Sequence, residues 1–403
     1  MADTAAHSPR TGEHEGIVAA LEALVSNTAK GKHHGDDERL GMSAAGNPYT
    51  PAPVAKQHHH HWWSKVAAVE GLSQSRLDDL FADHHLGNYT AIRGSEQRIF
   101  ESMPVAVRIG MHLLFFSSKK TSLLRYSSVE DVLEKMSIKQ GKLYDDASDP
   151  AAVLEHIKSF IETYQIDTSE LLEPDPIKYP SMNEFFFRKI RPDARPLAEQ
   201  GNAAVVSSAA DCRLTVFDDV EAATRVWIKG KHFSIRHLLG DTSLADRCFP
   251  PGSSLAIFRL APADYHRFHH PVGPAVCGPT RHEAGEYYTV NPQAVNADFD
   301  VFTCNRRDVL NLTWTPRAGV DVPVAFVAIG ALLVGSIGWS KASQGSSVAR
   351  GEEAGWFAYG GSTCIAVFPP AAKVTWDADL RANSLAGVET MVRVGDRIGI
   401  SEA

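Results

Sequence analysis

The sequence predicts an α+β fold, in which a mainly antiparallel β domain carries N-terminal helices packed on it. Downstream of Ala203, β-branched runs alternate with Gly, Pro, Asn and Asp turns, and helical spacing is scarce. Upstream, the segments VEDVLEKMSIKQGK and AAVLEHIKSFIETY place apolar residues at helical spacing. The connections between the predicted strands are short, so the β-rich part is expected to form one compact domain.

The chain of 403 residues divides into three predicted parts. Residues 1–66 are rich in Ala, His, Gly and Pro without sustained periodicity, which is typical of a disordered tail. Residues 67–176 are predicted to be helical, and residues 177–403 to form the β-rich domain. Ser181-Met-Asn-Glu184 has the spacing of a capping box, so a short helix that ends by Pro192 is expected there.

The charge and cysteine content exclude several classes of protein. Lys and Arg number 40 against 48 Asp and Glu, a net charge of −8, so a general nucleic-acid-binding protein is not expected. The five cysteines are far apart and form no C-x-x-C pair, which argues against a disulfide scaffold and fits a reducing compartment. The run His58–His61 has no acidic or thiol ligand beside it, so no metal site is predicted.

Two apolar segments raise the question of membrane contact. Val322–Trp339 is uncharged, but its glycines, Pro323 and β-branched residues predict two buried strands joined at a glycine rather than a spanning helix. Met103–Phe116 is apolar except for Arg108 and His112, which are four apart and share one helical face. This segment fits either a helix in a membrane interface or a core helix of the N-terminal layer.

The segment MADTAAHSPRTGEHEG at the N-terminus has no apolar stretch and contains three acidic residues. We therefore expect neither a secretory signal nor a mitochondrial transit peptide, and the predicted location is cytoplasmic.

Candidate acid–base residues cluster in two segments. In SSAADCRLTVF, Asp211 lies between small residues and a predicted strand, where by itself it also fits a turn former. In RLAPADYHRFHHP, His266 and His269 are three apart, and a turn would hold both imidazoles near each other. No further ligand stands at a zinc spacing, so acid–base chemistry is the preferred function and a structural role the alternative. His270 is predicted to lie at the surface.

A glycine pair precedes Ser362 in WFAYGGSTCIAVF, between two apolar strands. A tight hairpin is one interpretation. A nucleophile elbow or a phosphate loop would require a helix after the glycines, and a strand is predicted instead. A strained Gly361–Ser362 bond is also what backbone self-cleavage by a serine requires, because only glycine leaves the preceding carbonyl unshielded.

Seven segments, in one order, resemble the phosphatidylserine decarboxylase family, and in particular its fungal and plant endomembrane type. The similarity extends from about Met103 to the C-terminus. It is carried by NEFFFRKIRPDARP, SAADCRLTVF, WIKGKHFSIRHLLG, IFRLAPADYHRFHHPVG, GEYYTVNP, AIGALLVGSI and GWFAYGGST. The family's S-P-A-D-G is here Ser208-Ala-Ala-Asp-Cys212, which we interpret as a feature of this subgroup.

The resemblance implies autocatalytic endoproteolysis of a zymogen. Ser362 attacks the carbonyl of Gly361, and the resulting ester breaks to leave a pyruvoyl group on an α chain that begins at residue 362. The remaining β chain, residues 1–361, stays associated with it. The family's cleavage triad maps onto Asp211, His269 and Ser362, so that Asp211 orients the imidazole and His269 takes the hydroxyl proton. Thr363 is a candidate donor to the oxyanion.

The resemblance also implies the reaction, a carboxy-lyase step of phospholipid biosynthesis. By this resemblance, residues 177–403 are expected to form a pyruvoyl-dependent decarboxylase domain, which would convert phosphatidylserine to phosphatidylethanolamine and CO₂ through a Schiff base. His269 is the favoured acid for reprotonation, with His266 as its neighbour, and no metal takes part. The alternative is a soluble pyruvoyl-dependent decarboxylase of a free amino acid such as L-tryptophan. A homodimer and peripheral contact with endomembranes are expected.

A carrier function is a third hypothesis, because MVRVGDRIG resembles part of a lipoyl- or biotinyl-type β module. Such a module needs an exposed Lys at a hairpin tip, and the corresponding segment carries Gly-Gly-Ser instead.

Overall fold

The computed structural model describes residues 87–95, 98–102, 141–226, 228, 233–285, 301–330, 336–340, 344–358 and 362–403. Three sheets contain the strands β1 (Gly87–Ile92), β2 (Arg98–Ser102), β3 (Val205–Ser207), β4 (Cys212–Phe217), β5 (Ser254–Leu260), β6 (Arg267–His269), β7 (Ala275–Glu283), β8 (Arg307–Arg317), β9 (Val320–Gly330), β10 (Ile337–Trp339), β11 (Ser347–Val348), β12 (Glu353–Phe357), β13 (Ser362–Phe368), β14 (Val374–Trp376), β15 (Glu389–Val392) and β16 (Arg397–Ser401).

The helices are α7 (Pro150–Tyr164), α8 (Met182–Phe186), α9 (Val220–Val226), α10 (Ile235–Leu239), α11 (Thr242–Cys248), α13 (Val301–Cys304) and α14 (Ala378–Leu385), with the 3₁₀ turns η2 (Thr168–Glu170), η3 (Pro176–Lys178) and η4 (Pro370–Ala372). The combination of these helices with the three sheets confirms the predicted α+β class.

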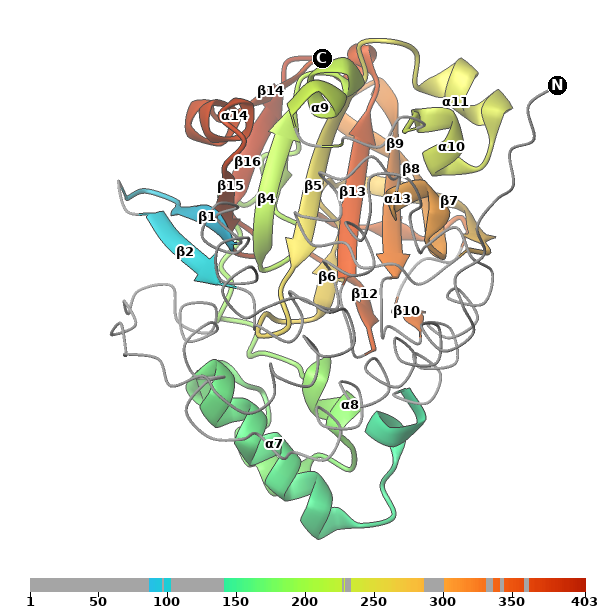
Figure 1. Cartoon of the computed structure of the whole chain (residues 1–403). Coiled ribbons are helices and arrows are strands. Elements are labelled where there is room, and N and C mark those ends of the chain that lie inside the picture. Colours follow the sequence, from blue (N-terminus) through green and yellow to red (C-terminus); the bar gives the residue numbers. More distant parts are fainter. Residues whose placement is uncertain are drawn as a thin grey trace, which may run out of the picture.

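A ten-stranded sheet in the order β11-β7-β8-β9-β13-β5-β4-β15-β1-β2 forms the centre of the molecule (Figure 1). Its strand pairs are antiparallel except for β1 and β15, which run parallel. β13 lies between β5 and β9 in this sheet, and all seven of its residues are buried. Burial on both faces explains why this strand is an almost continuous apolar run rather than an alternating one.

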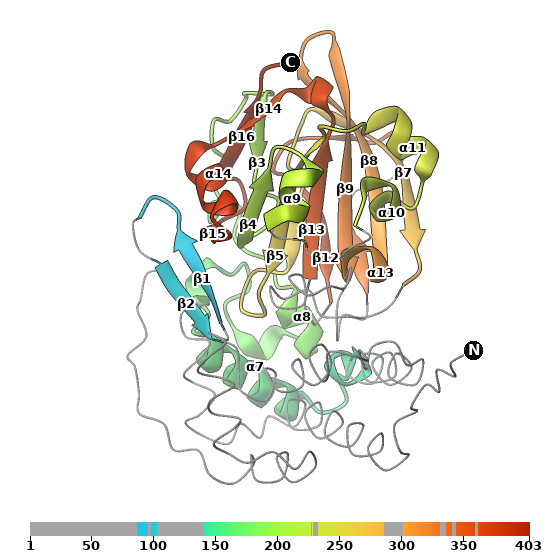
Figure 2. The same ribbon diagram turned by 45° about the horizontal axis from the view of Figure 1, so that its top comes forward.

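Different layers cover the two faces of the central sheet. Helices α9, α10, α11 and α13 pack on one face, around buried side chains such as Ile257, Val327 and Ile365 (Figures 1 and 2). The other face packs on the two three-stranded sheets, β10-β12-β6 and β14-β16-β3, through Phe268 and Phe357 among others. The side chains of Ile365 and Cys364 enter different cores because successive residues of a strand point to opposite faces.

A smaller helical layer lies at one end of the sheet, around α7 and α8 (Figure 1). Asp149 caps α7, since its Oδ1 accepts from the backbone N–H groups of Ala151 and Ala152 at 3.1 Å. The Ser181 hydroxyl likewise accepts from the N–H of Glu184 at 3.2 Å and starts α8, as the capping-box spacing predicts.

The N-terminal region departs from the helical prediction for residues 67–176. Strands β1 and β2 belong to the central sheet, because β1 pairs with β15 near the C-terminus. A boundary at residue 177 would therefore cut through one sheet. The strand pairing joins residues about 300 apart, so local spacing does not reveal it. The predicted tail 1–66 and the segment Met103–Phe116 lie outside the described residues.

The uncharged segment Val322–Trp339 contains most of β9, which ends at Gly330, and all of β10, so the prediction of two strands is confirmed. β9 is mostly buried as predicted, but the three residues of β10 are partly exposed. Among the residues that the structure describes, no helix is both long enough and apolar enough to span a bilayer.

Candidate active site

Ser362 is the first residue of β13, and its side chain is fully buried. Its backbone pairs with Leu260 of β5 and Gly330 of β9. The strand before the glycine pair, β12, belongs to a different sheet, so the hairpin interpretation is wrong. The chain crosses from one sheet to the other between Phe357 and Ser362. Gly361, the other residue of the predicted cleavage site, lies outside the described residues.

The Ser362 hydroxyl lies against His266. Its Oγ is 3.1 Å from Nδ1 of the imidazole, and Nε2 of the same ring is 2.9 Å from the carbonyl oxygen of Ala261. A carbonyl only accepts, so Nε2 carries the proton and Nδ1 is left as an acceptor for the Ser362 hydroxyl. Burial lowers the pKa of His266 to about 3, and the ring is therefore neutral at physiological pH.

The imidazole of His266 is held in place by an aromatic ring. Phe186, the last residue of α8, lies with its ring centroid 3.9 Å from that of His266 and inclined by 30°. Arg267, the next residue along, donates through Nε to the Phe187 carbonyl at 2.8 Å. The NEFFFRKI segment therefore fixes the position and the tilt of His266.

His269 has a separate set of partners. Its Nδ1 is 2.9 Å from the carbonyl oxygen of Gly351, so that nitrogen donates, and its Nε2 is 3.2 Å from the Tyr265 hydroxyl. Burial raises the pKa of Tyr265, which keeps the phenol protonated and able to donate to Nε2. Ser362 thus bonds to His266, whereas His269 bonds to Tyr265.

The electrostatic surroundings of the two histidines differ. Burial is the largest influence on both and lowers the pKa of each. For His266 the charges of Arg188 and Arg213 lower the pKa further. For His269 the Gly351 carbonyl and the carboxylates of Glu353 and Asp211 raise the pKa, and only the charge of Arg267 adds to the lowering by burial. A proton is therefore better accommodated on His269 than on His266.

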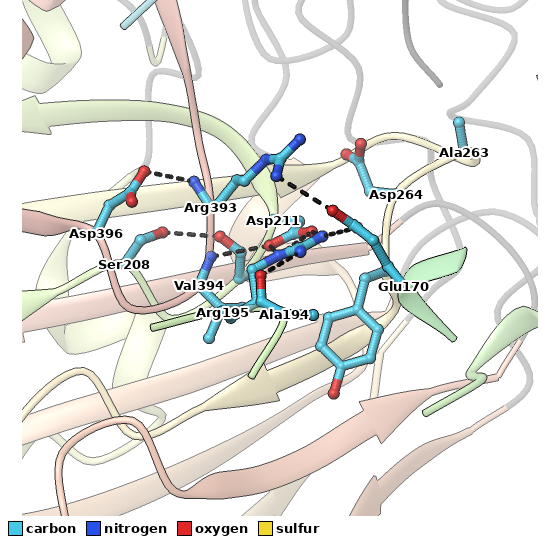
Figure 3. Close-up of polar contacts among 12 residues, drawn as sticks. Glu170, Ala194, Arg195, Ser208, Asp211, Ala263, Asp264, Arg393, Val394 and Asp396 are labelled. Atoms are coloured by element: carbon cyan, nitrogen blue, oxygen red, sulfur yellow. Dashed lines mark hydrogen bonds and ion pairs between the residues drawn. The ribbon is translucent and has the colours of Figure 1, made fainter. Parts of the chain in front are cut away.

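Asp211 is held by a guanidinium (Figure 3). Nε of Arg195 lies 3.0 Å from both carboxylate oxygens and Nη2 lies 2.6 Å from Oδ2, while the N–H of Val394 donates to Oδ1 at 2.8 Å. Glu170 accepts from Arg195 at 2.8 Å and from Arg393 at 3.3 Å. Within the described part of the chain, Asp211 makes no hydrogen bond to His269, so the predicted triad is not joined by direct contacts.

The model of the family described as phosphatidylserine decarboxylase matches residues 182–400, more than half of the chain. The chain belongs to the phosphatidylserine decarboxylase family. It is 37% identical over 348 residues to phosphatidylserine decarboxylase proenzyme 2 of Komagataella phaffii, covering 83% of this chain and 32% of that relative. It is 42% identical to proenzyme 2 of Oryza sativa, covering 77% of this chain and 48% of the relative.

A shorter bacterial relative is covered more completely. The chain is 40% identical over 243 residues to the phosphatidylserine decarboxylase proenzyme of Chlamydia trachomatis, which amounts to 60% of this chain and 77% of that relative. The chain spans 32% of the length of one of these eukaryotic relatives and 48% of the other.

Several features of this member of the phosphatidylserine decarboxylase family were not predicted. Tyr265, Arg195 and Phe186 each contact a candidate residue, and all three lie in the RLAPADYHRFHHP and NEFFFRKIRPDARP segments. His270 is fully buried rather than at the surface. Its backbone N–H donates to the Glu352 carbonyl and its carbonyl accepts from the N–H of Gly351, because the chain directly after β6 runs beside the segment directly before β12.

Thr363 stays a predicted oxyanion donor. Its hydroxyl is buried and has no hydrogen-bond partner among the residues described. The period of a strand directs its side chain to the face opposite that of Ser362.

A pyruvoyl group derived from Ser362 fits its surroundings in this member of the phosphatidylserine decarboxylase family. The side chain at position 362 is shielded from water and has an imidazole nitrogen at 3.1 Å. These are the conditions that a reactive ketone formed at this position would require.

Burial of His266 predicts a pH dependence of stability. Its pKa is about 3 in the folded chain, whereas a histidine in an unfolded chain titrates near 6.5. Between these values only the unfolded chain binds the proton, so stability is highest above about pH 6.5 and decreases as the pH falls toward 3. For the uncut Ser362→Ala chain, urea unfolding should give a free energy about 1.4 kcal/mol lower at about pH 5.5 than at about pH 7.5 from this residue alone.

The matched comparison is the same measurement after His266→Gln. This substitution should reduce, by that amount, the difference between the free energies of unfolding at the two pH values. An unchanged difference would mean that the pKa of His266 is the same in the folded chain as in the unfolded chain.

Proposed function

We propose that the chain is the zymogen of a phosphatidylserine decarboxylase, which cuts itself between Gly361 and Ser362. The observation that carries this proposal is the contact between the buried Ser362 hydroxyl and the acceptor nitrogen of His266, 3.1 Å apart at the start of β13. A hydroxyl held against an acceptor nitrogen is partly activated as a nucleophile, so this contact supports attack by Ser362 on a carbonyl.

In the proposed self-cleavage, the Ser362 oxygen bonds to the carbonyl carbon of Gly361. The peptide C–N bond breaks, the nitrogen of residue 362 takes a proton, and an ester results. Loss of the α proton expels the carboxylate of Gly361 and leaves dehydroalanine. Water then adds and ammonia leaves, which gives a keto group at position 362.

The two histidines have different roles in this proposal. His266 orients the hydroxyl through its Nδ1, but burial and two neighbouring arginines oppose its protonation. His269 takes the proton, because Glu353 and Asp211 favour its charged form. It must first exchange its bond with Tyr265 for one with Ser362. Arg195 keeps the carboxylate of Asp211 ionised and oriented.

The pyruvoyl carbonyl, once formed, supplies an electrophile that binds a primary amine and withdraws electrons from the bond to the departing CO₂. Around it, Phe186 and the buried strands exclude water, and His266 holds a neutral imidazole beside position 362. His269, whose neighbouring carboxylates favour the imidazolium, donates the proton that replaces CO₂. We also propose that Met103–Phe116 contacts a membrane interface and that the chain assembles into a homodimer.

Two measurements test the proposed function. Intact mass of the purified protein should give two chains that separate at residue 362, the shorter carrying a ketone in place of its N-terminal amine. Phosphatidylserine vesicles should then release CO₂, and free L-tryptophan should not. Turnover of tryptophan alone would establish the soluble amino-acid decarboxylase instead.

A further inference from the structure

A cavity of about 560 Å³ lies beside the candidate site. Its wall includes Asp211 and Tyr265 on the catalytic side, and it extends to Ile166 and Ile190 of the N-terminal layer. The hydroxyl of Tyr265 bonds to His269, so one wall of the cavity is a single residue away from that histidine, although Ser362 and the two histidines do not line the cavity themselves.

Six arginines line this cavity, and five of them contact a carboxylate. Arg93 contacts Asp377, Arg195 contacts Asp211, Arg213 contacts Asp264, Arg393 contacts Glu170 and Arg397 contacts Glu199. The sixth, Arg188, is only 4% exposed. Within the described residues its hydrogen bonds go to carbonyl oxygens alone, those of Phe186 at 3.3 Å, Ala263 at 3.0 Å and Asp264 at 3.2 Å.

A buried guanidinium without a contacting carboxylate is uncommon, because a charge is costly to remove from water unless it is paired. Burial lowers the pKa of Arg188 to about 10, so the group is still charged at neutral pH. Arg188 is also close to the chemistry, since it is two residues from Phe186, whose ring lies on His266.

We propose that Arg188 binds an anionic group of the substrate in this cavity, either the phosphodiester or the carboxylate of a serine headgroup. This inference rests on the proposed function. Arg188 also lies over the Phe185 ring, 5.3 Å from its centroid, but contacts no carboxylate among the described residues. The ligand supplies that anion, and the guanidinium has planar donors suited to either group. Bound there, the anion would neutralise a charge that otherwise opposes protonation of His266.

A binding experiment tests this without turnover. The uncut Ser362→Ala chain is titrated by calorimetry with glycerophosphoserine, and the titration is repeated after adding Arg188→Gln. A hydrogen-bonded charge pair of this kind predicts an affinity about 10- to 100-fold weaker in the second chain. Arg191→Gln is the matched control and should leave the affinity unchanged, because Arg191 is half exposed and pairs with Asp193 on the surface.

Two further ligands distinguish the anions. Glycerophosphoethanolamine has the phosphodiester without the carboxylate, and O-methyl-L-serine has the carboxylate without the phosphodiester. If Arg188→Gln weakens the binding of one of these ligands and not of the other, the anionic group of that ligand is the one that Arg188 binds. Equal affinities with and without Arg188, or no binding by the chain that retains it, would overturn the proposal.

Kinetics of the cut enzyme separate substrate binding from a purely structural role. Arg188→Gln should be cut normally and should raise KM for phosphatidylserine about 10-fold or more, with kcat within about threefold. A structural role would instead lower self-cleavage and kcat, since Arg188 also holds the loop of Ala263. If Arg188→Gln stays uncut, the same measurements are made on Arg188→Lys. An unchanged KM for Arg188→Lys, or a chain that again stays uncut, rejects the inference. Failure of the unsubstituted enzyme to release CO₂ would reject the proposed function but not the binding result.

Discussion

Ser362→Ala is expected to leave one full-length chain with no decarboxylase activity. The substitution removes the only atom that the proposal allows to attack Gly361, so neither the cut nor the ketone can form. The fold should persist, because the change deletes one hydroxyl from a strand that is paired on both sides. The cost is an unsatisfied Nδ1 on His266, about 1–3 kcal/mol of stability.

Cys364→Ser is the matched control for that variant. Cys364 lies two residues further along β13, is buried and points to the same face as Ser362. This variant should still be cut and active. Two chains in a Ser362→Ala preparation, or CO₂ release from it, would contradict the self-cleavage proposal.

His269→Ala is expected to slow self-cleavage by about 10²- to 10⁴-fold, the usual contribution of a general base. The reason is electrostatic, since Glu353 and Asp211 favour a proton on His269 whereas Arg188 and Arg213 oppose one on His266. The rate is obtained from mass spectra taken at intervals during a cell-free translation, as the decrease with time in the fraction of uncut chain.

The comparison with His266→Ala decides between the two histidines. This variant loses a contact that orients the hydroxyl, so we expect slower cleavage but a smaller loss than in His269→Ala. The reverse ranking would show that the histidine touching Ser362 is itself the base. His282→Ala is a suitable control, because that histidine is mostly exposed and pairs with Asp308 at 2.8 Å, away from the cavity.

Much of the architecture was predictable because its causes are local. The strands from residue 203 onward follow from β-branched runs and turn residues, and α8 follows from the Ser181 cap, which is formed by atoms three residues apart. Strands β1 and β2 were missed, since β1 is stabilised by pairing with β15 at the other end of the chain. The buried position of His270 was missed for the same reason, because its partner is the carbonyl of Glu352.

The reactive groups of this protein can be read from the order of its amino acids: a serine after two glycines, two histidines in one short segment, and an aspartate before a strand. These identities are properties of single residues and their neighbours. Which of these groups contact one another depends on how the chain folds. Ser362 contacts His266, 96 positions away, His269 bonds to Tyr265, and Asp211 is held by Arg195. Contacts between distant residues depend on strand pairing and on the face of the sheet to which each side chain points, and a hydrogen bond tolerates an error of only a few tenths of an ångström.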